Sequence, residues 1–188
     1  MTKKLLEIER KRQLTGNIEE LIGRLQNIGF ELKNNLREID TYYSRPDVDF
    51  MQTVECLRIR QRDSFAEVTY KPATTAATHT ENNVIIKPET NLPIQPEDAA
   101  TAKQLLANLG MMQLVEVNKY RRSFQSSDFP QATVAIDEIK NAGTFVEVEV
   151  LSDDEASALI MISELETKLG LDSMKIVTRP YRDICMGL

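Results

Sequence analysis

The stretch Glu7-Ile8-Glu9-Arg10-Lys11 decides the fold, and it lies almost at the start of the chain. Successive side chains of a β-strand point to opposite faces, so Glu7, Glu9 and Lys11 share one face. Ile8 and Arg10 then share the other face. Taken alone, this pattern also fits an ordinary amphipathic strand whose charged face is solvated. The later strands decide whether this charged face is merely solvated or forms part of a shared charged wall.

Length and charge limit the classes of protein to consider. A chain of 188 residues can bury a proper core, and we expect a single domain over residues 1–188. The net charge of −6 argues against a general binder of nucleic acid or anionic membranes, which depends on a basic surface. No apolar run reaches the roughly 18 residues that span a bilayer, and the N-terminal region reads as a charged strand. We therefore expect a cytoplasmic protein.

The cysteines, the histidine and the glycines exclude several kinds of site. Cys56 and Cys185 have no CxxC partner and no zinc spacing, which favours small buried side chains. His79 is the only histidine, so a multi-histidine metal site is excluded. No segment matches a P-loop or a GxGxxG fingerprint. Side chains, and not a glycine-rich backbone, would have to bind any phosphate.

The hydrophobic periodicity predicts an α+β fold with about eight strands and three longer helices. The helices are expected over 16–28, 97–109 and 153–169, each ending at a glycine, with a short helix after Pro180. The extended segments are expected over 3–13, 30–43, 54–62, 65–71, 83–92, 112–126, 132–140 and 144–151. Sequential hairpins predict an antiparallel sheet, and closure removes exposed edges. We therefore expect a closed eight-stranded antiparallel β-barrel with helices packed outside.

The first predicted hairpin turns at Asp63-Ser64. A two-residue turn there pairs Arg60 with Glu67 and Arg58 with Thr69. The polar residues that would share one face are Arg58, Arg60, Glu67, Thr69 and Lys71. The apolar residues on the opposite face are Leu57, Ile59, Val68 and Tyr70. This hairpin therefore repeats the separation of charged and apolar faces seen in the first strand.

The second predicted hairpin has Asn141-Ala142-Gly143 as a three-residue loop, with Gly143 in the left-handed position. This loop sets Asp137 opposite Glu147, with Glu149 two residues further on. Two other predicted strands also carry charges at alternate positions. These are Lys119 and Arg121 in 112–126, and Lys87 and Glu89 in 83–92. The three helices need an apolar partner, and the strand faces opposite the charges supply it. In a closed barrel the charges would then face the lumen.

A lumen that holds acids and bases in separate clusters fits one kind of ligand. Lysine and arginine bind a polyphosphate, and carboxylates bind the hard divalent cation that neutralises it. The alternative for each strand is a solvated face, and for the hairpin pairs it is a cross-strand salt bridge.

The order of these motifs resembles the CYTH superfamily, which unites class IV adenylate cyclases and thiamine triphosphatases on a triphosphate tunnel fold. Glu7-x-Glu9-x-Lys11 is similar to the family signature. The motifs that follow in the family's order are Leu57–Arg60, Thr69–Lys71, Lys87-x-Glu89, Lys119-x-Arg121, Asp137 and Gly143–Glu149. The closing stretch Arg179–Ile184 resembles the C-terminal segment of class IV cyclases. The chain departs from the family at Asn91, where a second acid is frequent, and at Lys87, where arginine is frequent.

The resemblance implies roles for particular residues. A Mg²⁺ or Mn²⁺ site would be formed by Glu7, Glu9, Asp137, Glu147 and Glu149. The triphosphate would be bound by Lys11, Arg58, Arg60, Lys71, Lys87, Lys119 and Arg121. Lys11 and Glu9 would act in catalysis. Apart from the resemblance, the loops over 44–53 and 72–82 are candidates for a mobile lid, because they are long, polar and adjacent to the charged strands.

Two enzymatic activities fit these residues. The resemblance favours a class IV adenylate cyclase, which converts ATP to cyclic AMP and pyrophosphate. The alternative is a triphosphatase that hydrolyses thiamine triphosphate, a nucleoside triphosphate or inorganic tripolyphosphate. A non-catalytic polyphosphate-binding module is a second alternative, which clustered acids argue against because they repel the ligand. In each case the partner is a small-molecule triphosphate, without nucleic acid or membrane. A second copy of the chain, in a homodimer, is a further candidate partner.

Overall fold

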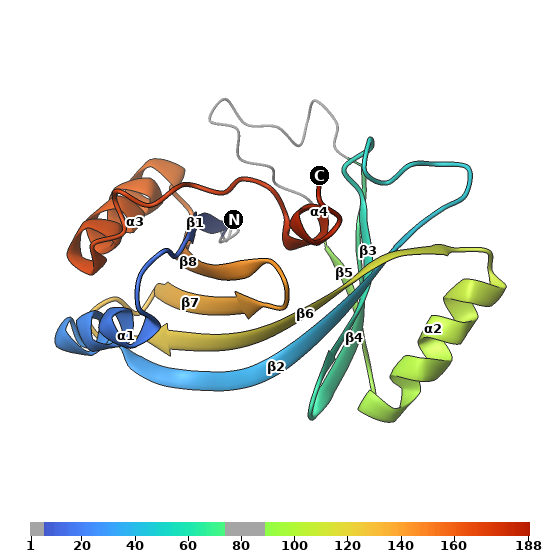
Figure 1. Cartoon of the computed structure of the whole chain (residues 1–188), viewed down its shortest axis with the longest axis horizontal. Helices are drawn as coiled ribbons and strands as arrows, with labels where there is room; N and C mark the ends of the chain where they lie inside the picture. Colours follow the sequence, from blue (N-terminus) through green and yellow to red (C-terminus); the bar gives the residue numbers. More distant parts are fainter. Residues whose placement is uncertain (1–5, 74–88) are drawn as a thin grey trace. The chain divides into compact units, whose positions relative to one another are not determined.

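A computed structural model describes residues 6–73 and 89–188 of the chain (Figure 1). The strands are β1 (Leu6–Gln13), β2 (Glu31–Ser44), β3 (Cys56–Arg62), β4 (Phe65–Lys71), β5 (Thr90–Ile94), β6 (Met112–Gln125), β7 (Ala132–Ile139) and β8 (Gly143–Ser152). The helices are α1 (Ile18–Asn27), α2 (Ala99–Asn108, preceded by a 3₁₀ turn over Pro96–Asp98), α3 (Glu155–Leu169) and α4 (Tyr181–Cys185). The expected helices, and the expected strands other than 83–92, are therefore confirmed within the described residues. Residues 83–88 of that remaining strand lie outside the described residues, and β5 begins at Thr90, directly after Glu89.

The described strands form one eight-stranded antiparallel sheet in the order β1-β8-β7-β6-β2-β3-β4-β5. β1 and β5 stand at the two ends of this order, and within residues 6–73 and 89–188 no strand pairing joins them. The antiparallel sheet with helices is thus confirmed, whereas its closure into a barrel is not shown. A short bridge between Arg12 and Ile176 covers part of the free edge of β1.

The two predicted hairpins have different outcomes. The turn at Asp63-Ser64 is confirmed, because Arg60 pairs with Glu67 and Arg58 with Thr69. The second prediction was wrong: Asp137 pairs with Phe145, not with Glu147.

The loop of this second hairpin is 140–142, because Asn141 adopts the left-handed conformation with φ 65° and Gly143 already belongs to β8. Asparagine tolerates that conformation, so the turn starts one residue earlier than a glycine-centred loop would. The partner of each residue shifts by two positions. Such a shift leaves every side chain on its predicted face.

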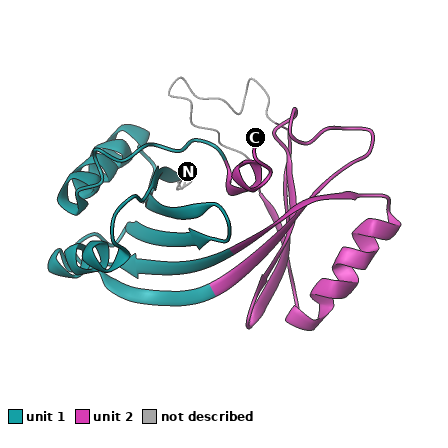
Figure 2. Ribbon diagram, viewed as in Figure 1, with its two compact units in different colours: residues 1–36, 119–179 teal, residues 37–118, 180–188 magenta. Residues whose placement is uncertain are grey.

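The chain divides into two compact units, shown in different colours in Figure 2. Unit 1 comprises Met1–Leu36 with Lys119–Arg179, and unit 2 comprises Arg37–Asn118 with Pro180–Leu188. The boundaries fall inside β2 and β6, so each of these long strands contributes residues to both units.

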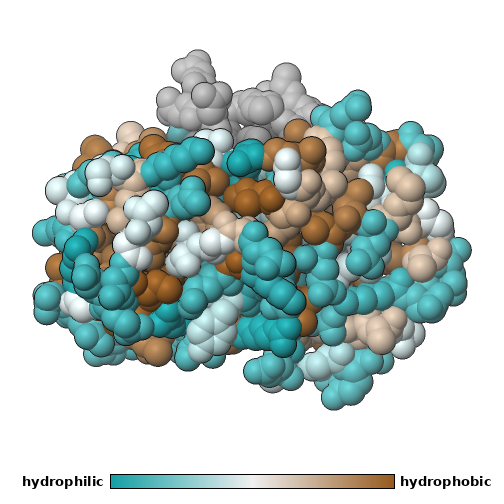
Figure 3. Space-filling model, viewed as in Figure 1, coloured by the Kyte–Doolittle hydropathy of each residue, from teal (hydrophilic) through white to brown (hydrophobic). Residues whose placement is uncertain are grey.

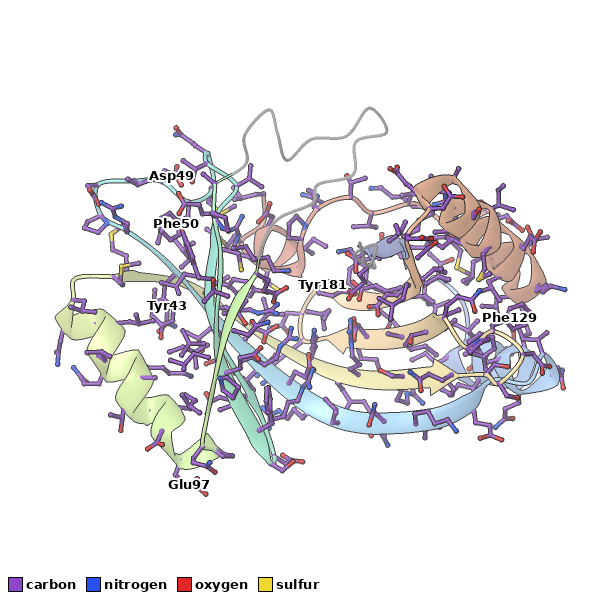
Figure 4. All side chains as sticks on the ribbon, turned by 180° about the vertical axis from the view of Figure 1, so that it is seen from behind. Tyr43, Asp49, Phe50, Glu97, Phe129 and Tyr181 are labelled. Atoms are coloured by element: carbon purple, nitrogen blue, oxygen red, sulfur yellow. The ribbon has the colours of Figure 1, made fainter. Side chains whose placement is uncertain are left out.

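Unit 1 has its core between the apolar faces of β1, β7 and β8 and the helices α1 and α3. Val148, Ile162 and Leu165 belong to this core and are almost fully buried. Burying one such side chain contributes about 1.5–3 kcal/mol to the free energy of unfolding. Phe129, labelled in Figure 4, packs against the same core and stacks on Phe30 with 5.8 Å between ring centroids. The odd-numbered charged residues of these strands, such as Glu9, Asp137 and Glu147, therefore lie on the face away from the helices.

Both long helices of unit 1 have side-chain caps or glycine ends that fix their limits. Asp154 caps α3 by accepting hydrogen bonds from the backbone N–H groups of Ala156 and Ser157. Gly170 ends α3 with φ 68°, and a Cβ atom there would lie 2.6 Å from the Arg24 guanidinium. That guanidinium donates to the carbonyl of Leu169 and joins α1 to the end of α3.

A buried ion pair connects β1 to α3. Arg12 donates from Nε and Nη2 to the two carboxylate oxygens of Glu166, at 2.6 and 2.7 Å. It also donates to the backbone carbonyls of Asp172 and Met174. Arg10 adds one bond of 2.9 Å to Glu166 from a more exposed position. Arg12 is therefore part of the structure of unit 1, on the face opposite Glu9 and Lys11.

Unit 2 has a smaller core, in which α2 packs on β2, β3 and β4. Tyr43, Ile59, Ala66 and Ala99 are its buried members. Figure 4 shows Tyr43 between α2 and the strands. The face of β3 and β4 that carries Ile59 and Ala66 is thus used for packing, which leaves the opposite face to the charged residues.

Hydrophilic side chains form most of the surface visible in Figure 3, and hydrophobic residues show between them. Among the described residues, no helix has both the length and the apolar character needed to cross a bilayer.

The Arg12–Glu166 pair gives a stability prediction. Arg12→Met should lower the free energy of unfolding by about 3–5 kcal/mol, because it leaves a buried carboxylate without its main partner. Arg10→Met should cost far less, because Arg10 is partly exposed and contributes a single bond to Glu166. Urea unfolding of both variants at pH 7 measures the difference. Equal losses would contradict the assigned burial of Arg12.

Candidate functional site

Three glutamates from two neighbouring strands gather on the charged face of unit 1. The β1–β8 register sets Glu9 opposite Glu149 and Lys11 opposite Glu147. Carboxylate oxygens of Glu7, Glu9 and Glu149 all lie within 4.8 Å of one another. Because β1 and β8 are antiparallel, alternate residues of both strands project from the same face. This group could hold one metal ion with oxygen ligands alone.

The protonation of these glutamates reflects their crowding. Burial raises the pKa of Glu149 to about 8, and repulsion from Glu147, Glu7 and Glu9 adds to this against the opposing effect of Arg121. Burial also raises the pKa of Glu9, together with repulsion from Glu147. Without a cation, Glu149 and Glu9 therefore retain protons at a pH where an ordinary glutamate is ionised.

Arg121 on β6 binds the remaining acids of this face. Its Nε and Nη2 donate to the two oxygens of Asp137, at 2.7 and 2.5 Å, in a bidentate ion pair. Nη2 also contacts Glu147, and Nη1 lies 3.7 Å from Glu149. Asp137 is fully buried. Two of the five predicted metal ligands, Asp137 and Glu147, are thus engaged with Arg121 in this structure.

The two lysines predicted for unit 1 are both buried. Lys11 lies with its Nζ 3.8 Å from a carboxylate oxygen of Glu147. Lys119 lies on β6 two residues before Arg121 and therefore on the same face. Lys11, Lys119 and Arg121 thus share the face that carries the glutamates, as the sequence predicts.

Unit 2 carries a second charged face, built from β2, β3 and β4. Arg60 donates from Nε and Nη2 to the two oxygens of Asp40, at 2.7 and 2.8 Å. Arg62 donates to Glu38, which is 0% exposed. Asp40 and Glu38 are buried carboxylates, and the two arginines supply the positive charge that compensates them. Arg60 and Arg62 are therefore fixed by the protein itself.

Arg58 differs from its neighbours because its partners are distant. Its guanidinium lies 4.0 Å from Asp40 and 3.9 Å from Glu89, at the limit of an ion pair. Its buried Nε has no hydrogen-bond partner among the described residues. The Nζ atom of Lys71 lies 3.0 Å from a carboxylate oxygen of Glu89. Lys71 and Arg58 therefore share this carboxylate. Arg58 has donors left for a ligand that brings oxygen acceptors.

Sequence reasoning missed the acids of β2. Glu38, Asp40 and Tyr42 alternate along the strand, and the register places Asp40 opposite Arg60 and Tyr42 opposite Arg58. Tyr42 is buried, which raises its pKa and keeps the phenol neutral. The period-two spacing of these residues was the available signal. Lys87 and most of the predicted lid segment 72–82 lie outside the described residues.

The CYTH domain family matches residues 5–181 of the chain. The chain is a CYTH protein. The match covers the glutamates, Lys11 and the arginines of both charged faces, and it confirms the resemblance noted from the motifs.

Three relatives show which activities occur among proteins similar to this CYTH protein. A protein of Methanocaldococcus jannaschii, named provisionally as an adenylate cyclase, is 25% identical over 183 residues, which are 96% of this chain and 98% of the relative. Adenylate cyclase CyaB of Aeromonas hydrophila is 33% identical over 91 residues, 47% of this chain and 46% of the relative. Human thiamine-triphosphatase is 28% identical over 191 residues, 93% of this chain and 82% of the relative.

Solved structures support the fold. Two proteins of Pyrococcus horikoshii OT3 superpose with TM-scores of 0.73 and 0.72, at 20% and 27% sequence identity. The alignments cover 95% and 94% of this chain and 99% and 96% of the other chains.

The raised pKa of Glu149 predicts how stability depends on pH in the absence of a metal. Its folded pKa of about 8 lies above the value of 4.5 for an ordinary glutamate. The contribution to stability is therefore complete below about pH 4.5 and is lost as the pH rises through about 8. Glu149→Gln removes this titration, so its melting temperature in EDTA should fall less between pH 5 and 9.

Thermal melts at pH 5, 6, 7, 8 and 9 measure this difference. Mg²⁺ should raise the melting temperature of the wild type most at high pH, because the cation competes with protons. Identical slopes for wild type and variant would show that Glu149 does not titrate in this range.

Proposed function

We propose that this CYTH protein is a divalent-metal-dependent enzyme that acts on a triphosphate, with adenylate cyclase as the first assignment. The observation that carries the proposal is the group formed by Glu7, Glu9 and Glu149. Three crowded carboxylates repel one another and repel a polyphosphate, so they are useful to an anion site only with a bridging cation. The names of the relatives support a triphosphate as the substrate.

The residues present fit Mg²⁺ or Mn²⁺. The group offers only carboxylate oxygens, which these hard cations prefer over nitrogen and sulfur. Burial and mutual repulsion raise the pKa of Glu149 and Glu9, as expected for acids whose counter-ion is a bound cation. When bound, the cation neutralises charge on the phosphate oxygens. Glu7, Glu9 and Glu149 would hold it, and Asp137 and Glu147 complete the proposed set.

The cationic residues would bind the phosphates. Arg58 is the strongest candidate in unit 2, because its donors have only distant partners. Arg121 is held by Asp137 and Glu147, so it would contribute a fixed positive charge. The further members of the proposed set are Lys11, Arg60, Lys71, Lys87 and Lys119. A closed tunnel and a single domain over 1–188 stay part of this proposal and rest on family membership and on the order of the motifs.

In the cyclase reaction, the 3′ hydroxyl of ATP attacks the α-phosphorus. The bond to the β-phosphate oxygen breaks, pyrophosphate leaves, and the hydroxyl proton passes to a base or to solvent. Such a transfer needs positioning and charge neutralisation more than a covalent protein group. Lys11 and Glu9 lie on the same face of β1 and would act nearest the nucleophile. In a triphosphatase, water would attack the terminal phosphorus instead.

The triphosphatase has a specific observation in its favour. Human thiamine-triphosphatase matches nearly the whole chain, at an identity close to that of the archaeal relative with the cyclase name. The same residues would serve either reaction, since both bind a triphosphate and a cation.

Product analysis separates the two reactions. With ATP and Mg²⁺ or Mn²⁺, a cyclase should release cyclic AMP and pyrophosphate in equal amounts and should leave 3′-deoxy-ATP unchanged, because its nucleophile is missing. EDTA should abolish turnover. Phosphate release from 3′-deoxy-ATP and inorganic tripolyphosphate, without cyclic AMP from ATP, would replace the cyclase assignment by the triphosphatase.

Substitution of Arg58 tests the phosphate-binding assignment. Arg58→Ala should weaken binding of inorganic tripolyphosphate by at least tenfold, because a charge-assisted hydrogen bond is worth about 1.5–3 kcal/mol. Arg37→Ala is the matched control, since Arg37 lies on the opposite face of β2 from Asp40 and is exposed. Calorimetric titration in Mg²⁺ gives both affinities. Equal losses of affinity in the two variants would mean that Arg58 contributes only through the net charge of the protein.

A further inference from the structure

The C-terminal helix α4 carries a buried arginine that the proposed reaction does not use. Arg182 is 5% exposed. Its Nη1 donates to the backbone carbonyl of Glu55 at 2.8 Å, and its Nε donates to Asp183 at 2.8 Å. The Glu55 carbonyl immediately precedes Cys56, the first residue of β3. A buried guanidinium is therefore used to hold the point at which β3 begins.

The side chain of Glu55 is held as firmly as its carbonyl. Its two carboxylate oxygens accept from the Tyr70 hydroxyl at 2.6 Å and from the Thr53 hydroxyl at 2.9 Å. Its backbone N–H donates to the carbonyl of Phe50 at 3.0 Å. Phe50 is buried, and its ring lies 6.5 Å from that of Tyr70. Figure 4 labels Phe50 on the segment between β2 and β3 and Tyr181 on α4.

The residue before Glu55 is in a costly conformation. Val54 has φ 56°, in the left-handed region that β-branched residues rarely adopt. Such a residue persists only where its surroundings fix it, and it marks a segment held in one particular form. The bonds at Glu55 supply that restraint.

This anchored segment adjoins two residues of the proposed phosphate site. Cys56 pairs with Lys71, and Tyr70, the donor to Glu55, directly precedes Lys71. Arg58 lies two residues beyond Cys56 and has no close side-chain partner of its own among the described residues. Its position therefore depends on the backbone of β3.

We propose that Arg182 is a positioning residue for the phosphate site, which fixes the start of β3 through the Glu55 carbonyl and so places Arg58 and Lys71. The inference rests on the proposed function, because it concerns binding of the same triphosphate. The inference gives a role to the Arg179–Ile184 motif, which supplies none of the proposed metal or phosphate ligands. Arg182 acts through Glu55 and does not itself touch the substrate.

The test compares full-length variants by calorimetric titration with inorganic tripolyphosphate in Mg²⁺. Arg182→Met keeps the length of the side chain and removes its donors, and it should weaken binding about tenfold. Arg182→Lys retains a charged donor and should recover part of the affinity. Arg179→Met is the matched control from the same motif, because Arg179 is exposed, and it should bind as the wild type does.

A kinetic measurement separates positioning from a purely structural role. Positioning predicts a higher KM for the triphosphate with a smaller change in kcat, once the fraction of folded protein is measured by circular dichroism. Loss of stability with unchanged affinity and KM would overturn the proposal. If Arg182→Met does not fold, Tyr70→Phe removes only the hydroxyl donor to Glu55, and it should raise KM in the same direction. Unchanged KM in that variant would likewise overturn the proposal.

The two proposals fail in different ways. Absence of tripolyphosphate binding and of turnover in the wild type would overturn the proposed function and, with it, this inference. Binding by the wild type that Arg182→Met retains in full would overturn the role of Arg182 alone.

Discussion

Compensation of charge on the polar faces of the strands is the constraint on which the rest of the structure depends. The strands β1, β7 and β8 in unit 1, and β3 and β4 in unit 2, pack apolar residues against helices. Acids and bases are crowded on the opposite faces of these strands. Crowded like charges and unpaired buried charges are both costly, so partners must be close. Asp137 with Arg121 and Asp40 with Arg60 meet this need with two hydrogen bonds per pair.

Within the part of the chain that the structure describes, two groups are compensated only in part, and both suggest a ligand. The carboxylates of Glu7, Glu9 and Glu149 crowd negative charge together, and burial with this repulsion raises the pKa of Glu149. Arg58 has the opposite imbalance, with donors whose acceptors are distant. A divalent cation would correct the first imbalance, and the oxygens of a phosphate would correct the second. Charges already satisfied by the protein are better regarded as a fixed electrostatic environment.

Period-two reasoning predicted the faces of the strands correctly, since it depends only on the pleat. The register was harder to predict. The two-residue turn at Asp63-Ser64 permits only one register between β3 and β4. In the second hairpin, Asn141 and Gly143 both tolerate a left-handed conformation, so the sequence permits two registers between β7 and β8. The partners of β2 could not be read from a turn, because the segment from Arg45 to Glu55 separates it from β3. The compensation of Arg60 by Asp40 therefore emerged only from the structure.

The most direct measurement is a crystal structure with Mn²⁺ and a non-hydrolysable triphosphate analogue, with Mn²⁺ located by its anomalous signal. The account predicts a peak about 2.1 Å from oxygens of Glu7, Glu9 and Glu149, with phosphate oxygens bonded to the Arg58 guanidinium. A peak bound elsewhere, or a triphosphate without contact to Arg58, would contradict it.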